Sequence, residues 1–387
     1  MNKPIYLNFA ATSINKPKVM LNAVCQYLTN DAPLSYNRSL SSDDGTDITY
    51  QAREEVAKFF NVKESSHVVF TENITMSLNM VLNGLLKRGD HVIASSVEHN
   101  AVMRPLTLLK EKLGIEITLL PSTKEGVVNS KDLEKEIRSN TKFMVLPGAS
   151  NVLGTILPIK ELFKMAKARG MITVLDSAQT AGFLSIDMEK DFIDVLTFTG
   201  HKSLQALSGV GGFALTGEMA SEMEPWLVGG TGNFSHSLIQ PETMPEKFES
   251  GTPNVVGILS LLESIRWINQ VGIGNIATYQ MELTEKFLLG LEKLPVRVLG
   301  TKDIHQMVPV VSLTSDKFSA SELSYQLFQQ YNILTRSGLH CAPNAHQVAG
   351  TFPDGAVRFS FGYTTTAKEI ELTLEALGEL LDGRWEI

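Results

Sequence analysis

Two short apolar runs, each followed by polar residues, decide how this chain is expected to fold. Residues 172–176 read Ile-Thr-Val-Leu-Asp, and residues 195–202 read Val-Leu-Thr-Phe-Thr-Gly-His-Lys. Both apolar runs have the length of a buried strand and contain residue types that strands favour. Because open α/β sheets bind ligands beyond the ends of their strands, Asp176 and Lys202 are candidate site residues at one edge of a sheet.

Similar runs recur on both sides of this pair. From about residue 67 to 216, short apolar runs alternate with segments of helical periodicity, several of which stop at glycine. The runs are residues 67–71, 91–94, 116–120, 143–146, 172–175, 195–198 and 212–215, and the helical segments include 75–86, 102–113, 130–138 and 159–169. Apolar strands that alternate with helices are typical of a largely parallel sheet covered on both faces. The sequence therefore predicts an α/β fold with a mostly parallel seven-stranded sheet.

The alternation ends in a polar, glycine-rich stretch at residues 227–253. Helical patterns follow at 256–270 and 276–294, and strand-like runs at 307–313 and 357–360. A chain of 387 residues is too long for one small core, so two domains are expected. We predict a large domain of residues 15–255 and a smaller C-terminal α+β domain of residues 256–387, which residues 1–14 join.

Composition and charge indicate an ordinary globular enzyme. The chain is 43% hydrophobic and 20% charged, and its net charge is −8 without any basic block, which argues against nucleic acid or an anionic membrane as a partner. No run reaches membrane-spanning length, and the first residues lack the apolar stretch of a signal peptide. The two cysteines, Cys25 and Cys341, fit a reducing compartment, so we expect a cytoplasmic protein. Cys25, in the helical pattern of residues 19–28, is interpreted as core or filler.

A lysine and a carboxylate at neighbouring strand ends fit the chemistry of pyridoxal 5′-phosphate (PLP). This cofactor needs a lysine for its Schiff base and a carboxylate against its pyridine nitrogen, roles open to Lys202 and Asp176. Thr75 stands at a predicted helix start, where backbone N–H groups and a hydroxyl can bind a phosphate. His99 and Asn151 also follow strands. Taken singly, Thr75 could be a helix cap, His99 a solvated loop residue and Asn151 a turn residue.

Taken in chain order, these positions and their neighbours resemble one family. The motifs are Thr75, Glu98-His99-Asn100, Ser150-Asn151-Val152-Leu153-Gly154, Asp176-x-x-Gln179, Thr199-Gly200-His201-Lys202, Phe248-Glu249-Ser250-Gly251-Thr252-Pro253 and Arg336-Ser337-Gly338-Leu339-His340-Cys341-Ala342-Pro343. This series looks like the class V aminotransferase superfamily and, within it, the group II cysteine desulfurases and selenocysteine lyases. The resemblance covers essentially the whole chain and implies fold type I of the PLP-dependent transferases.

The resemblance implies a role around PLP for each matching residue. Lys202 would form the Schiff base and move protons at the substrate Cα, and His99 would stack on the ring beside it. Asp176 would pair with the pyridinium nitrogen, and Gln179 would donate to the ring hydroxyl oxygen. The remaining cofactor-binding positions would be Thr75, Met76, Asn151, Thr199 and His201, with Gly251 and Thr252 reaching in from a second subunit. The resemblance thus implies a homodimer with active sites at the interface, and it implies no metal.

The substrate would be held and attacked by residues from the last third of the chain and by Asn151. Asn151 and Arg358 would receive the carboxylate of a small amino acid, Arg358 through a bidentate fork. Arg358 is also a lone charge in an apolar strand, which favours a paired, functional role. Cys341 would be the nucleophile, and an imidazolium at His340, a further substrate-binding candidate, would favour its thiolate.

The reaction that the resemblance implies is that of a PLP-dependent cysteine desulfurase, which converts L-cysteine to L-alanine and leaves a persulfide on Cys341 for an acceptor protein. The same residues also suit a selenocysteine lyase. The alternative is another class V enzyme, an aminotransferase or a C–S β-lyase, in which Cys341 is incidental. A non-catalytic interaction protein is disfavoured by the complete set of site residues. Three features depart from the family pattern: Leu339 stands where a second histidine is frequent, Ala206-Leu207 stand where Gly-Pro is common, and residues 37–44 carry two acids without a counterpart.

Overall fold

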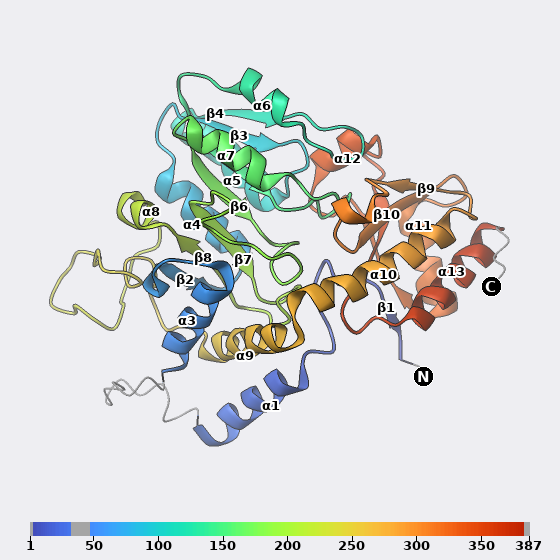
Figure 1. The fold of residues 1–387 in the computed structure, drawn as a ribbon, viewed down its shortest axis with the longest axis horizontal. Helices are drawn as coiled ribbons and strands as arrows, with labels where there is room; N and C mark the ends of the chain where they lie inside the picture. Colours follow the sequence, from blue (N-terminus) through green and yellow to red (C-terminus); the bar gives the residue numbers. More distant parts are fainter. Residues whose placement is uncertain (1–2, 32–46, 383–387) are drawn as a thin grey trace.

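The computed structural model describes residues 3–31 and 47–382, and its centre is a seven-stranded sheet (Figure 1). The strands are β2 (Val68–Thr71), β3 (His91–Ser95), β4 (Glu116–Leu120), β5 (Thr141–Pro147), β6 (Ile172–Asp176), β7 (Val195–Thr199) and β8 (Gly211–Leu215). Their spatial order is β2-β8-β7-β6-β5-β3-β4, and only β8 runs antiparallel to its neighbours. The mostly parallel seven-stranded sheet is confirmed. Residues 37–44 lie outside the described residues.

Helices cover both faces of this sheet. They include α4 (Ile74–Leu85), α5 (Asn100–Leu113), α6 (Ser130–Glu136), α7 (Ile159–Ala168) and α8 (Gly217–Glu222), with a 3-10 turn at Ser65–His67. Val195 packs in one buried cluster with Leu78 of α4, whereas the next residue, Leu196, packs in another with Phe163 of α7. Burial on both faces explains why the strands read as continuous apolar runs. No helix in the described residues is long and apolar enough to cross a bilayer.

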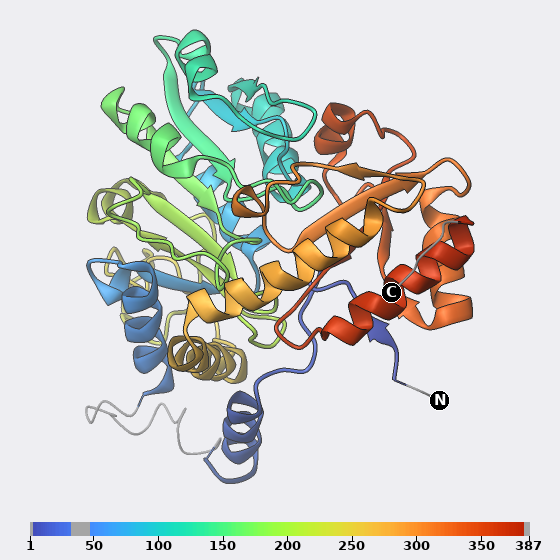
Figure 2. The ribbon, with the colours of Figure 1, turned by 45° about the vertical axis from the view of Figure 1, so that its right-hand side comes forward.

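A second, four-stranded sheet forms the smaller unit. Its strands β9 (Val296–Leu299), β10 (Val310–Ser315), β12 (Arg336–Gly338) and β13 (Ala356–Ser360) are antiparallel in the order β12-β13-β10-β9. The helices of this part are α10 (Ile273–Leu291), α11 (Ala320–Tyr331), α12 (Pro343–Ala349) and α13 (Ala367–Leu381), with a 3-10 turn at Ile304–Gln306. Strand β1 (Ile5–Tyr6) pairs in parallel with β11 (Ile333–Leu334), so the N-terminal residues lie with the C-terminal part of the chain (Figure 2).

Helix α9 (Val255–Val271) packs with the large unit, although the sequence pattern assigned residues from 256 onward to the small domain. Its buried residues Ile258 and Leu262 share a core with Met20 of α1 (Lys18–Gln26) and Phe60 of α3 (Ile48–Phe60). The chain then turns into α10 at Gly272, where φ is +88°. This packing joins α9 to the helices around the large sheet. Periodicity identifies the apolar face of a helix but not the domain that this face meets.

Cys25 is exposed, so its interpretation as core or filler is wrong. The buried face of α1 carries Met20 and Val24, four residues apart, as helical periodicity requires. Cys25 is one position further and points away from that face. The helical segment was identified correctly, but the side on which the cysteine lies was not.

Candidate active site

The sheet brings the polar residues expected in the site to one edge. Strands β2 and β7 both pair with β8, and their last residues, Thr71 and Thr199, both lie opposite Gly211. Asp176 ends the neighbouring strand β6, and Lys202 follows β7 by three residues. The carboxyl ends of these strands therefore gather the helix start after β2, the acid after β6 and the lysine after β7, which is where α/β sheets bind ligands.

Lys202 is an amine surrounded by charged groups. Burial lowers the pKa of its ammonium to about 8, against the opposing effect of Asp176. The guanidinium groups of Arg358 and Arg336 lower this pKa further, and the Cys341 sulfur raises it. Among the described residues no hydrogen-bond acceptor engages Nζ. A lysine with a lowered pKa has an appreciable neutral fraction, which can act as a nucleophile or a base.

Asp176, which interacts with Lys202, is one of two buried carboxyl groups whose charges affect each other; the second is Glu98. Asp176 accepts a hydrogen bond at 2.9 Å from the Ala178 N–H, and burial raises its pKa while Lys202 opposes the rise. Glu98 accepts hydrogen bonds from the N–H and hydroxyl of Ser95 through Oε1, whereas its buried Oε2 has no partner within the described residues. Burial raises the pKa of Glu98 well above its usual range, and the charge of Asp176 adds to this. Burial thus favours the neutral form of Glu98, a feature that the sequence did not indicate.

His99 is a neutral ring fixed by the helix that follows it. It is the N-cap of α5, where its Nδ1 accepts a hydrogen bond from the Ala101 N–H at 3.0 Å. This bond places the remaining ring proton on Nε2. Burial lowers the pKa of His99 to about 4, and the positive charge of Lys202 contributes. A neutral, oriented imidazole is suited to stacking on an aromatic ring, the role that the resemblance implied.

Two buried polar atoms at the end of β7 fit an anion. Thr199 Oγ1 and His201 Nδ1 are buried, and neither has a hydrogen-bond partner within the described residues. Thr75 is exposed on the first turn of α4. The N-cap of this helix is Asn73 and not Thr75, because the Asn73 side chain accepts a hydrogen bond from the Met76 N–H at 3.0 Å. The hydroxyl of Thr75 is consequently not used for capping. Unpartnered donors beside a helix N-terminus form a suitable phosphate site.

Arg358 is a buried cation without an anionic partner in the described residues. The side chain is only 1% exposed, and its Nη atoms donate to the Asn151 carbonyl at 3.0 Å and to Asn8 Oδ1 at 3.1 Å. Its Nε is buried and unpartnered within the same residues. Burial lowers the pKa of Arg358 to about 9, and the charge of Arg336 lowers it further. A guanidinium with an unused donor in such a position can bind a carboxylate.

Cys341 is exposed in the turn between β12 and α12. His340 and Cys341 both have left-handed backbone conformations, with φ of +51° and +57°. The Asn100 N–H donates to the Cys341 carbonyl at 2.7 Å and thereby ties the turn to the helix after His99. Nη2 of Arg336 lies 3.7 Å from Cys341 Sγ. Arg336 was quoted only as part of a motif, and its charge is what a thiolate at Cys341 would face.

His340 differs from its expected role. Its ring Nε2 lies 3.1 Å from the Arg336 carbonyl and its Nδ1 3.3 Å from His346 Nε2, so both nitrogens have partners inside the protein. Burial lowers the pKa of His340 to about 3. Burial thus favours a neutral His340 ring over the imidazolium expected beside Cys341, because the residue is 2% exposed and has no acidic partner within the described residues. No ring nitrogen of His340 remains for a substrate. Its contact with Asn151 is made by the backbone, because Asn151 Nδ2 donates to the His340 carbonyl at 2.8 Å.

Gln179 and Lys202 line the same small cavity, of about 20 Å³, at the junction of the two sheets. The Gln179 Nε2 donates to the Ala10 carbonyl at 3.2 Å, so one of its two amide protons remains for a ligand.

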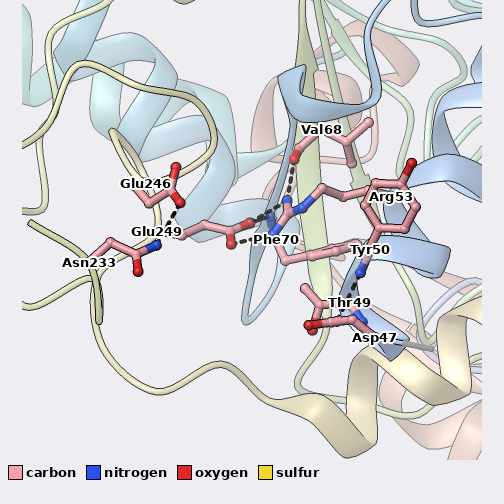
Figure 3. Close-up of polar contacts among 9 residues, drawn as sticks. All are labelled: Asp47, Thr49, Tyr50, Arg53, Val68, Phe70, Asn233, Glu246 and Glu249. Atoms are coloured by element: carbon pink, nitrogen blue, oxygen red, sulfur yellow. Dashed lines mark hydrogen bonds and ion pairs between the residues drawn. The ribbon is translucent and has the colours of Figure 1, made fainter. Parts of the chain in front are cut away.

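Gly251, Thr252 and Met76 line a different cavity, of about 440 Å³. Figure 3 shows how the preceding residues are anchored there: Arg53 binds Glu249 in a bidentate pair at 2.5 and 2.7 Å, and Glu249 also accepts from the Phe70 N–H. Within one chain these three positions therefore do not lie in the cavity of Lys202.

Comparisons with known proteins agree with this geometry. The family model of class-V aminotransferases matches residues 5–373. A probable cysteine desulfurase of Pyrococcus abyssi is 31% identical, over 97% of this chain and 94% of the relative, and one of Vibrio cholerae is 29% identical, over 98% and 94%. The solved structure of the apo cysteine desulfurase from Thermococcus onnurineus NA1 superimposes with a TM-score of 0.91 at 32% identity and covers 98% of this chain and 95% of that one. A cysteine desulfurase from Escherichia coli gives a TM-score of 0.88 at 25% identity, with the same coverage.

Proposed function

The chain belongs to the class V aminotransferase family, in its cysteine desulfurase group, and we propose that it is a PLP-dependent cysteine desulfurase that transfers sulfur from L-cysteine to Cys341. One observation carries the choice of reaction: Cys341 is exposed, lies 3.7 Å from the Arg336 guanidinium and is electrostatically coupled to Lys202 and Arg358. An incidental cysteine would need no such position.

The residues present fit PLP at each of its polar ends. The unpartnered Thr199 Oγ1 and His201 Nδ1 suit its phosphate, and the buried Asp176 suits a cationic nitrogen, which would restore the charge that burial disfavours. Lys202 offers the amine for the covalent link, and neutral His99 offers a flat ring. When bound, the cofactor stabilises negative charge that develops at the substrate Cα.

The chain itself orients the amino acid and moves one proton. The free Nε of Arg358 and its two anchored Nη groups receive the substrate carboxylate, and the Asn151 carbonyl fixes the guanidinium plane. With the carboxylate held, the Cα–H can be directed toward Lys202. Nζ of Lys202, whose pKa is lowered to about 8, takes that proton as a base and later returns a proton to carbon.

Cys341 then takes the sulfur. Its thiolate attacks the sulfur atom of the substrate, an S–S bond forms, and the substrate C–S bond breaks with its electron pair kept on the carbon side. That carbon gains a proton and leaves as alanine. One L-cysteine and one Cys341 thiol thus give one L-alanine and one Cys341 persulfide, and no external oxidant is needed. Arg336 stabilises the attacking thiolate, since a thiol is a poor nucleophile.

We also propose a homodimer in which Gly251 and Thr252 complete the site of the partner. They lie outside the cavity of Lys202 and are held outward by the Arg53–Glu249 pair. The segment before them exposes apolar side chains, among them Val228 at 62% and Ile239 at 80%, and it projects away from the sheet in Figure 1. A second copy would cover such a surface, whereas an acceptor protein would need access to Cys341.

The function is tested with the purified protein loaded with PLP. We expect L-cysteine to yield alanine in equal amount to the persulfide formed in a first turnover, and mass spectrometry to locate one added sulfur atom on Cys341. The variant Cys341→Ser should still bind PLP yet form no persulfide, whereas Cys25→Ser should behave as wild type. Alanine production by Cys341→Ser at the wild-type rate would show that Cys341 is not the sulfur acceptor, whereas pyruvate, ammonia and sulfide as the products would indicate a C–S β-lyase. A comparison with selenocysteine as substrate tests the lyase activity.

A further inference from the structure

Lys16 is a half-buried lysine whose ammonium binds only neutral oxygen atoms in the described part of the chain. Its Nζ donates to Ser13 Oγ at 2.6 Å, to the Ala206 carbonyl at 2.6 Å and to the His201 carbonyl at 3.4 Å. No ion pair of Lys16 occurs among the described residues. These three acceptors match the three protons of an ammonium group.

The His201 carbonyl is a point of convergence. Besides Lys16, it accepts from the Ser13 N–H at 2.8 Å, from the Ser13 hydroxyl at 2.9 Å and from the Thr12 hydroxyl at 3.2 Å. This carbonyl belongs to the peptide bond that joins His201 to Lys202. Residues 12–16 are therefore hydrogen-bonded to the backbone immediately before Lys202, the lysine to which we assign the cofactor.

The two carbonyl oxygen atoms that Lys16 binds, those of His201 and Ala206, lie at the two ends of the turn that carries Lys202. Within this turn the Gln205 N–H donates to the Lys202 carbonyl and the Ala206 N–H donates to the Gly200 carbonyl, both at 2.9 Å. Gln205 has a left-handed φ of +62°, a conformation that a non-glycine residue adopts only when its surroundings hold it. By binding the carbonyls of His201 and Ala206 together, Lys16 closes the turn from outside.

A buried ammonium without a carboxylate is unfavourable for folding, since burial lowers the pKa of Lys16 to about 8. An apolar side chain of the same length would avoid this cost but could not bridge the two carbonyls. The charge of Lys16 also acts on the site directly. Burial lowers the pKa of His201 to about 4, and the positive charges of Lys202 and Lys16 contribute to this shift.

We propose that Lys16 is a positioning residue that fixes the turn of Lys202 by bridging the His201 and Ala206 carbonyls. This inference rests on the proposed role of Lys202 in the reaction, although the bridge itself is a property of the chain alone. The sequence offers no signal for it, because Lys16 is separated from the turn by about 185 residues.

The test compares Lys16→Met, Lys16→Arg and the control Lys18→Met in the PLP-loaded protein. Lys18 is the exposed first residue of α1. In Lys16→Met we expect amide hydrogen exchange of residues 200–207 to be about tenfold faster, while the peptides of β3 and β5 keep their wild-type rates. We expect kcat with cysteine to fall about tenfold with KM within about twofold, because the substrate carboxylate site is untouched. Lys16→Arg, which keeps the cation, should restore most of both, and Lys18→Met should match wild type.

Wild-type exchange at residues 200–207 in Lys16→Met would overturn the proposal, and so would a uniform increase across the whole large unit, which indicates general destabilisation. If Lys16→Met does not fold, Lys16→Gln is measured in its place, with the same expected result. The exchange data and the absorbance maximum of the bound cofactor are read without turnover. These two readouts therefore still test the bridge if the protein proves not to be a desulfurase. If both the exchange rates at residues 200–207 and the absorbance maximum are the same in Lys16→Met as in wild type, the bridge is rejected.

Discussion

Several residues of the site have a buried polar atom that lacks a hydrogen-bond partner. Thr199, His201, Arg358 and Glu98 each bury one polar atom that has no partner within the described residues. Burying an unsatisfied polar atom costs about 1–3 kcal/mol, so a folded chain keeps such atoms mainly where a ligand completes them. The four belong to three segments far apart in the sequence, at the carboxyl ends of β3 and β7 and on β13. An anion at Thr199 and His201 and a carboxylate at Arg358 would satisfy three of these four atoms.

Arg336 provides the first prediction at this scale. Its guanidinium faces the Cys341 sulfur, and without it the thiolate would lose its nearest positive charge. We expect Arg336→Met to slow the alkylation of Cys341 by iodoacetamide about tenfold near pH 7, because the thiolate is the reacting form. Arg336→Lys should retain most of the rate. Peptide mass spectrometry gives the rates, and the exposed Cys25 serves as an internal control whose rate should not change. Equal rates at Cys341 in wild type and Arg336→Met would contradict the assignment.

At the scale of elements, the positions of strands could be predicted from the sequence more accurately than the way in which helices pack. The runs at 172–175 and 195–198 match β6 and β7 to within a residue, since strands buried on both faces are continuously apolar. The domain to which α9 belongs could not be predicted, because its apolar face suits either core. The same holds for site charges. The motif around Cys341 pointed to a reactive cysteine, but the burial of His340 and its contacts with Arg336 and His346, which favour a neutral ring, follow only from the folded structure.

The Arg53–Glu249 pair is the contact that fixes the segment leading to Gly251 and Thr252 (Figure 3). Arg53 also donates to the Val68 carbonyl and lies over the Phe70 ring at 4.8 Å, so α3, β2 and this segment meet at one guanidinium. We expect Arg53→Met to lower the free energy of unfolding by about 3 kcal/mol, because it leaves Glu249 largely buried without its partner.

The measurement is urea denaturation of the PLP-free protein. Lys135→Met, which removes a surface pair with Asp132, should change the same quantity far less than Arg53→Met does. The double variant Arg53→Met/Glu249→Met should be more stable than Arg53→Met alone, since no charge is then left unpaired. A loss equal to that of the control would show that the buried pair does not anchor the segment.

Several buried histidines make the whole molecule sensitive to acid. Burial lowers the pKa of His99, His201 and His346 to about 4 and that of His340 to about 3. As the pH falls below about 6.5, the unfolded chain binds protons at these residues before the folded one does, so stability falls. The loss accumulates between about pH 6.5 and pH 4, where each fully buried histidine adds a slope of up to about 1.4 kcal/mol per pH unit.

The expected result is a melting temperature that drops steeply over this window, and a shallower drop in His346→Asn, whose ring is fully buried in wild type. His305→Asn, which replaces an exposed histidine, should leave the slope unchanged. A flat melting temperature between pH 6.5 and pH 4.5 would mean that these rings are protonated in the folded protein, contrary to their burial.

The last prediction concerns the assembly, because a composite site has a consequence that a self-contained one lacks. If Thr252 of one subunit completes the site of Lys202 in the other, Lys202→Ala and Thr252→Asp should both be inactive as homodimers, the second because its carboxylate repels the phosphate. In a hybrid of the two, one site contains both substitutions, whereas the other contains an intact Lys202 and an intact Thr252. Unfolding and refolding an equal mixture makes half of the dimers hybrids, so about a quarter of the wild-type activity should return. Each variant refolded alone is the control, and mixing without refolding should restore little. If Lys202 and Thr252 acted within one chain, every site in the hybrid would carry one substitution, and the refolded mixture would stay inactive.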